Sequence, residues 1–207
     1  MTAGRRVAEQ GGPRVELVAV GLGNPGQEFA GSRHNYGAEA VRLVARRHGA
    51  SLRPEKGTNA ETAVVRAGGK GLLVAVPQTY MNDSGLAVRA LWRRYLGPSA
   101  SPEQLVVVHD ELDLAPGDVR VKMGGGTAGH NGLRSVQAHL HTSEFARVRI
   151  GVGKPSSRGS GVDHVLRRPS KRDREALEVA TELAADAVEA IFTGGMAAAM
   201  NRFNTRS

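Results

Sequence analysis

Short apolar runs alternate along this chain with segments whose apolar residues recur at helical spacing. Residues 16–23 and 105–108 are almost wholly apolar, which is typical of strands buried within a sheet. Residues 35–48 instead present one apolar face and are followed by Gly49, as a helix would be. Further strands are predicted at 60–66, 72–76, 119–123 and 147–152, and further helices at 86–96, 132–141 and 170–192. This interleaving predicts one α/β domain whose mixed, mostly parallel sheet is covered by helices on both faces.

The chain of 207 residues divides into a short polar arm and this domain. Residues 1–14 contain a Gly-Gly-Pro sequence and lack the apolar core of a secretory signal, so we interpret them as a flexible arm. The α/β domain is assigned to residues 15–207. No apolar run approaches the roughly 20 residues that cross a bilayer, so no membrane partner is expected. The glycine- and serine-rich stretch 153–161 is predicted to be a mobile loop.

Composition narrows the possible chemistry. The chain has no cysteine, which excludes disulfides, thiolate metal sites and a cysteine nucleophile and fits a reducing, cytoplasmic compartment. Its net charge of +8 favours an anionic partner, with nucleic acid first. Residues 147–174 hold nine basic and only two acidic side chains, a concentration that fits contact with a phosphate backbone. The alternative, which stays open for Lys171 to Arg174 in particular, is a solvated helix start.

The first glycine cluster, Gly21-Leu-Gly-Asn-Pro-Gly26, follows a predicted strand and fits the spacing of a dinucleotide-binding turn. That site also needs a helix to begin at the glycines and an acidic residue about 20 positions later. The residues after Gly26 have no helical periodicity, and the later position is Arg46. A dinucleotide site is therefore the less favoured interpretation of this cluster.

Two polar segments carry the groups of an acid–base pair. His34 lies in a polar loop just before the helix predicted at 35–48. Asp110 belongs to the polar segment 109–113, which directly follows the apolar strand 105–108, and ligand sites of α/β sheets gather at the carboxyl ends of strands. A carboxylate there would hold a histidine ring in one tautomer and stabilise its protonated form. The alternatives are an ordinary surface histidine and a solvated acidic turn.

Two further segments could contribute hydrogen-bond donors. Asn82 follows the strand 72–76, where it would either cap the next helix, the favoured interpretation, or donate its amide to a developing oxyanion. The glycine-rich loop 124–132 precedes a helix, so its backbone can approach a ligand closely. The sequence contains no Walker loop, no G-x-S-x-G serine elbow and no H-E-x-x-H zinc motif.

Six segments, taken in this order, resemble the signatures of the bacterial peptidyl-tRNA hydrolase family. They are GLGNPG (21–26), SRHN (32–35), PQTYMN (77–82), HDELD (109–113), GGGTAGHNGL (124–133) and FARVRIGVG (145–153). The resemblance runs from about residue 15 to residue 204. It implies a single three-layer α/β/α domain. It also implies hydrolysis of the ester that joins a peptide to the 3′-terminal ribose of tRNA, which recycles tRNA during translation.

The same resemblance implies roles for particular residues. His34 matches the general base and Asp110 the acid that orients it. The substrate- and tRNA-binding positions are Asn24, Phe29, Met81, Asn82, Asn131, Lys122 and Arg149, of which the last two match the cations that grip the 5′-phosphate of tRNA. The loop after Gly153 matches a mobile lid, and the turn 129–132 lines the peptide groove with Met81. The implied protein is a cytoplasmic monomer that uses no metal and no cofactor, and its partner is the acceptor stem and 3′ end of peptidyl-tRNA.

Three positions depart from the family pattern. Phe29 replaces a more usual tyrosine, which removes a hydroxyl, and Val76 replaces a frequent lysine. Tyr36 stands where a small aliphatic residue is expected, so it would either narrow a nearby pocket or pack into the core. The remaining alternative for the whole chain is a non-catalytic RNA-binding protein built on the same scaffold.

Overall fold

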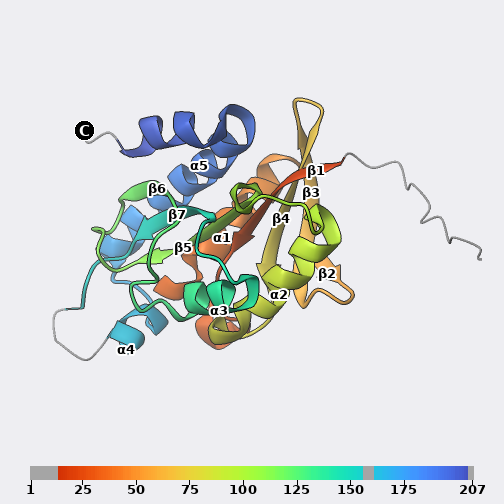
Figure 1. The fold of residues 1–207 in the computed structure, drawn as a ribbon. Helices are drawn as coiled ribbons and strands as arrows, with labels where there is room; N and C mark the ends of the chain where they lie inside the picture. The colour runs from red at the N-terminus through yellow and green to blue at the C-terminus, as the bar shows by residue number, and fades with distance from the viewer. Residues whose placement is uncertain (1–13, 156–160, 205–207) are drawn as a thin grey trace, which may run out of the picture.

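The strands and helices form a seven-stranded sheet between two layers of helices (Figure 1) in the computed structural model, which describes residues 14–155 and 161–204. The strands are β1 Val15–Gly21, β2 Arg53–Glu55, β3 Ala60–Ala67, β4 Lys70–Pro77, β5 Leu105–Glu111, β6 Val119–Met123 and β7 Ala146–Gly151. The helices are α1 Tyr36–Arg47, α2 Ser84–Leu91, α3 Asn131–Leu140, α4 Gly161–Leu166 and α5 Lys171–Asn204. The α/β fold is confirmed, and β2 and α4 are additions that the sequence did not predict.

The sheet has the strand order β2-β3-β4-β1-β5-β7-β6. Its centre is parallel, since β1 pairs with β4 and β5, and β5 pairs with β7. The pairings β2–β3, β3–β4 and β6–β7 are antiparallel. The sheet is therefore mixed, with β3 and β6 running against the other five strands of the described chain.

Alternation of side chains along the strands produces one apolar core on each face of the sheet. On one face, α1 and α5 pack over Val106, Val148 and Ile150. On the other face, α2 and α3 pack over Val20 and Val107. Both faces of β1, β4 and β5 are covered, which is why each of these strands contains a continuous apolar run in sequence.

Close backbone contact brings the start of α1 against the ends of β1 and β5. A side chain at Gly37 would collide with the Val108 carbonyl oxygen, and one at Gly21 would collide with the Gly37 carbonyl oxygen. Glycine at both positions lets the loop that carries His34 lie directly on the carboxyl end of β5. That strand runs to Glu111, three residues beyond the prediction, so Asp110 lies within it and not in a following turn.

The C-terminal helix α5 differs from the prediction in its length. The predicted helix ends before Gly194 and Gly195, whereas α5 continues to Asn204. Gly195 has a φ of 82°, so the two glycines mark a break between two helical pieces and not an end. By length and composition α5 is the one helix of the described residues long and apolar enough to cross a membrane. A third (33%) of its most apolar 18-residue stretch is buried in the fold. Its buried side packs on the sheet core with α1.

Two predictions concern segments outside the described residues. Nearly all of the predicted arm, residues 1–13, lies there, as does the middle of the predicted mobile loop, residues 156–160. Helix α4 begins at Gly161, the last residue of that predicted loop, and the residue after it, Arg167, accepts a hydrogen bond from the Arg33 N–H beside His34.

Candidate active site

His34 and Asp110 meet at the carboxyl end of the sheet. The Nδ1 atom of His34 lies 2.7 Å from Oδ1 of Asp110, between a short 3-10 helix, Arg33–Asn35, and strand β5. His34 is 8% exposed and Asp110 3% exposed, so water screens this contact little. The structure therefore brings together the two residues expected to form an acid–base pair.

The neighbours of His34 in the chain fix its position from both sides. The Asn35 side chain accepts a hydrogen bond from the Asn24 backbone N–H at 2.8 Å and donates one to the Asn24 carbonyl at 3.0 Å. The Arg33 guanidinium reaches the carboxylate of Asp173 at 3.0 Å. Arg33, His34 and Asn35 are all buried. The ring of His34 is thus carried by a segment with little freedom to move.

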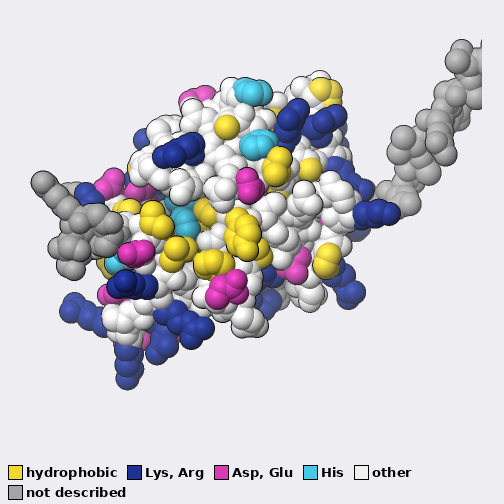
Figure 2. Space-filling view, turned by 90° about the horizontal axis from the view of Figure 1, so that it is seen from below, with side chains coloured by type: hydrophobic (Ala, Val, Ile, Leu, Met, Phe, Trp, Pro, Cys, Tyr) yellow, Lys and Arg dark blue, Asp and Glu magenta, His cyan; other side chains and the backbone are white. Residues whose placement is uncertain are grey.

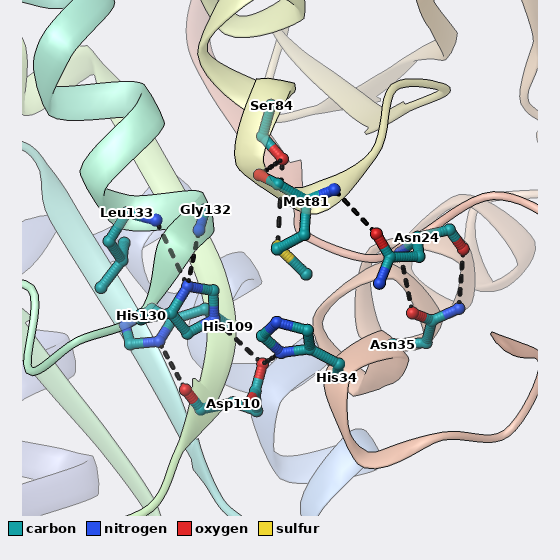
Figure 3. Close-up of polar contacts among 10 residues, drawn as sticks. All are labelled: Asn24, His34, Asn35, Met81, Ser84, His109, Asp110, His130, Gly132 and Leu133. Atoms are coloured by element: carbon teal, nitrogen blue, oxygen red, sulfur yellow. Dashed lines mark hydrogen bonds and ion pairs between the residues drawn. The ribbon is translucent and has the colours of Figure 1, made fainter. Parts of the chain in front are cut away.

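A second histidine, His130, approaches the same oxygen of Asp110. Its Nε2 lies 3.0 Å from Oδ1, while its Nδ1 accepts hydrogen bonds from the backbone N–H groups of Gly132 and Leu133 at 3.1 and 3.3 Å (Figure 3). His130 is the N-cap residue of α3. It belongs to the segment 124–133 that carries the family resemblance, but the sequence indicated no role for it. Its position just before a helix was the available signal, because N-cap side chains accept backbone N–H bonds.

The charge on Asp110 determines how the two rings are protonated. Burial by itself would raise the pKa of this carboxyl, but His130 and His34 hold it well below its usual range. An ionised carboxylate only accepts hydrogen bonds, so the nitrogen that each histidine turns toward it carries a proton. For His130 this fits the two N–H groups that point at Nδ1. For His34 it means that the neutral form of the ring has its lone pair on Nε2, the atom that a general base would use.

A third histidine, His109, lies behind this pair and is 1% exposed. Its ring meets that of His130 edge to face at 5.1 Å between centroids, and its Nδ1 donates to the carbonyl of Asp110 at 2.8 Å. Burial, reinforced by repulsion from His130, lowers the pKa of His109 to about 3. This ring is therefore a neutral part of the wall behind Asp110.

The acid–base pair opens into a pocket of about 440 Å³. Figure 2 shows apolar side chains gathered around a histidine on this face of the molecule. The apolar part of the lining consists of Phe29, Tyr80, Met81, Leu112, Val162, Val165 and Leu166. An elongated molecule with apolar groups can lie in this pocket with a polar bond over His34.

All three asparagines of the expected site line this pocket. The Asn24 Oδ1 accepts the Met81 N–H at 2.7 Å, and in Figure 3 its amide nitrogen points toward the space beside His34. Asn131 is the first residue of α3 and is exposed. Asn82 is also exposed, and the N-cap of α2 is Asp83 with no side-chain cap bond. The favoured interpretation of Asn82 as a helix cap is therefore wrong.

Of the three residues that depart from the family pattern, one lines the pocket and two lie in the core. Phe29 lines the pocket, with its ring 6.5 Å from that of Tyr80 in an edge-to-face arrangement. Met81 also lines it and is buried. Tyr36 and Val76 belong to the core beneath α1 and α5. Of the two alternatives for Tyr36, the structure therefore supports packing into the core.

The two expected phosphate-binding cations lie on the edge ribbon of β6 and β7. In its register Lys122 pairs with Arg147 and Arg120 with Arg149, so all four side chains share one face. Lys122 is exposed, whereas Arg149 is held by the Glu111 carboxylate at 3.0 Å. Arg149 therefore has a protein partner with which a phosphate would have to compete.

The site also has donor atoms suited to a metal ion. The ring nitrogens of His34 and His130 and an oxygen of Asp110 all lie within 4.8 Å of one another. Those atoms are nevertheless already paired with each other by hydrogen bonds.

The dinucleotide interpretation of the first glycine cluster, residues 21–26, is not supported by the structure. A short 3-10 helix, Gln27–Phe29, follows the cluster, and α1 begins only at Tyr36.

Comparison with known proteins adds an independent line of evidence. A sequence profile of the family described as peptidyl-tRNA hydrolase matches residues 18–207. A peptidyl-tRNA hydrolase of Cutibacterium acnes is 46% identical over 198 residues, covering 91% of this chain and 98% of that protein. One of Haemophilus influenzae is 46% identical over 192 residues, covering 92% and 97%. The crystal structure of peptidyl-tRNA hydrolase from Acinetobacter baumannii superposes with a TM-score of 0.86 at 34% identity and covers 95% of this chain and 99% of that one.

Proposed function

The chain belongs to the peptidyl-tRNA hydrolase family, and on that premise we propose that it hydrolyses the ester between a peptide and the 3′-terminal ribose of tRNA. The observation that carries the proposal is the 2.7 Å contact between His34 and Asp110 at the floor of an open, largely apolar pocket. An ester is more reactive than an amide, so water activated by one base suffices and no covalent nucleophile is required.

In the proposed reaction, Nε2 of His34 takes a proton from a water molecule as that water attacks the ester carbonyl. The Asp110 carboxylate holds the ring and stabilises the imidazolium that forms. The tetrahedral intermediate then collapses, and His34 returns the proton to the departing 3′-oxygen of the ribose. The products are a peptide with a free carboxyl group and tRNA with its terminal hydroxyls restored.

Negative charge develops on the carbonyl oxygen during the attack. Candidate donors to it are the side-chain amides of Asn24, Asn82 and Asn131 and the backbone N–H groups of Gly129 and Asn131, all at the pocket wall. One such donor lowers the barrier by about 3–4 kcal/mol. Phe29 and Met81 supply apolar contact for the peptide.

The RNA part of the substrate is polyanionic, and the net charge of +8 suits it. Lys122 and Arg149 are assigned to phosphate contact with the acceptor end of the tRNA. The monomeric state and the cytoplasmic location expected from the sequence remain part of this proposal.

The experiment is incubation of the purified chain with N-acetyl-aminoacyl-tRNA labelled in the acyl group. Release of free N-acetyl amino acid with intact tRNA supports the proposal. Aminoacyl-tRNA with a free amino group is the matched control substrate. Tight tRNA binding without release would favour the alternative, a non-catalytic RNA-binding protein on the same scaffold.

A further inference from the structure

The junction between α4 and α5 carries a dense set of basic side chains, which we call the α4–α5 elbow (residues 167–174). Its exposed cations are Arg167, Arg168, Lys171, Arg172 and Arg174. Within the described residues, no ion pair involves any of these five. The single acid of the elbow, Asp173, forms an ion pair with the buried Arg33. The nearest acid beyond the elbow in the sequence is Glu175, directly after Arg174.

The elbow is separate from the other basic side chains of residues 147–174. Arg147 is buried and donates to the carbonyls of Gly125 and Gly126, so it shapes the glycine loop. Arg149 is paired with Glu111. The basic residues of β7 thus have protein partners, whereas the elbow presents its charges to solvent.

The backbone of the elbow is held in place from beneath. The Arg33 guanidinium lies 3.3–3.5 Å from the carbonyl oxygens of His164, Arg167 and Arg168. The Arg168 guanidinium in turn donates to the Ala30 carbonyl at 3.0 Å. A fixed backbone lowers the entropic cost of binding an anion with the charged side chains.

The elbow continues directly from the wall of the pocket. Val165 and Leu166 line the pocket, and Arg167 is the next residue. The Arg33 N–H donates to the Arg167 carbonyl at 3.3 Å, and the residue after Arg33 is His34. Figure 2 shows Lys and Arg side chains beside the apolar patch, on the side where α4 and the start of α5 lie.

We propose that the α4–α5 elbow binds the sugar–phosphate backbone of the tRNA whose 3′ end occupies the pocket. This inference rests on the proposed function and adds a second phosphate-binding surface to that of Lys122 and Arg149. The ester over His34 is covalently attached to a polyanion, so binding in the pocket raises the local concentration of phosphates around it. The nearest exposed cations beyond the pocket wall then face RNA and not solvent.

The test is the salt dependence of tRNA binding by a variant with Arg167→Gln, Lys171→Gln and Arg172→Gln. The matched control carries Arg53→Gln, Lys56→Gln and Arg93→Gln, which remove three exposed charges around β2 at the opposite edge of the sheet. For the elbow variant, the slope of log affinity against log salt should fall by about one for each phosphate that the protein no longer neutralises. Its affinity near 0.1 M salt should fall about tenfold or more. The control should keep the wild-type slope.

Hydrolysis separates this inference from the proposed function. The elbow variant should lose kcat/KM on N-acetyl-aminoacyl-tRNA but keep it on the N-acetyl-aminoacyl ester of adenosine, which has no phosphate. A wild-type salt slope in the elbow variant would overturn the inference while leaving the hydrolase intact. Absence of hydrolysis by the wild-type chain, with the slope still reduced in the variant, would overturn the proposed function and leave the RNA contact standing.

Discussion

The Nε2 atom of His130 lies 3.0 Å from the Oδ1 atom of Asp110, the oxygen that the candidate base also contacts. One carboxylate oxygen therefore receives two ring N–H groups, and both side chains of this pair are buried. Asp110 is therefore an ionised acceptor that His130 holds in place independently of His34.

The first prediction separates the charge of Asp110 from its geometry. Because both histidines bond to Oδ1, the Asp110→Asn variant retains an acceptor in place and loses only the negative charge. A hydrogen bond to a charged group is worth about 1.5–3 kcal/mol, so kcat should fall about 10- to 100-fold. Asp110→Ala, which also removes the acceptor, should lose more. Equal kcat values for the two variants would contradict a role for the oxygen as a fixed acceptor.

The second prediction concerns His130 as a positioning residue. His130→Asn keeps an N-cap acceptor for α3 but cannot bridge to Asp110, so the free energy of unfolding should change by less than about 1 kcal/mol. Since Asp110 loses a support, kcat should fall about tenfold or more at unchanged KM. His139→Asn, on the same helix, is the control that should keep its kcat. A raised KM at constant kcat would place His130 in substrate binding instead.

The third prediction follows from the low pKa of His109. The unfolded chain protonates this residue near pH 6.5, whereas the folded chain does so only near pH 3. The contribution of His109 to stability is thus complete above pH 6.5 and is lost as the pH falls toward 3, by up to about 1.4 kcal/mol per pH unit. Urea unfolding of wild type and His109→Gln at pH 7.0 and 4.5 measures this. The variant should lose less stability between the two pH values, and equal losses would contradict the assignment.

The fourth prediction concerns Arg33, which ties the loop of His34 to the pocket wall. Lysine at this position cannot reach Asp173 and several backbone carbonyls together, so α4 should be held less firmly. Arg33→Lys should raise KM for N-acetyl-aminoacyl-tRNA about tenfold, with a smaller change in kcat. Arg42→Lys, at the surface ion pair with Glu61, is the matched control. Equal effects of the two substitutions would mean that Arg33 has no special link to the site.

Much of the fold was predictable because each central strand is buried on both faces. The apolar run at 105–108 therefore predicts β5. The apolar run at 16–20, which is followed by glycines, predicts its parallel neighbour β1. The predicted strand ended at Val108 because the next three residues, His109, Asp110 and Glu111, are polar. Their burial depends on the pocket and on partners distant in sequence, which local periodicity does not report.

The C-terminal helix shows a second limit of sequence patterns. Two adjacent glycines normally end a helix, and Gly195 does leave the helical region. The alanine- and methionine-rich segment beyond it has high helix propensity, so the chain resumes a helix. Its buried Phe203 belongs to the core shared with β6, an interaction between residues far apart in the chain.

The candidate site was also predictable from the sequence only in part. His34 and Asp110 were identifiable as chemical types at a loop and a strand end, and the structure brings them together. His130 was not identified, because its function depends on bonds in two directions, to Asp110 and to backbone N–H groups of α3. Its place just before a helix could have indicated the N-cap bonds, but nothing in the sequence indicates the second bond, to Asp110.

The most direct test of the proposed mechanism is the rate of N-acetyl-aminoacyl-tRNA hydrolysis by the His34→Ala variant, measured at saturating enzyme together with its Kd for tRNA. We predict a rate lower by at least about a thousandfold, as expected when the general base and its oriented partner stop acting together, with an unchanged Kd. Hydrolysis at the wild-type rate by a variant that still binds tRNA would contradict the assignment of His34 as the base.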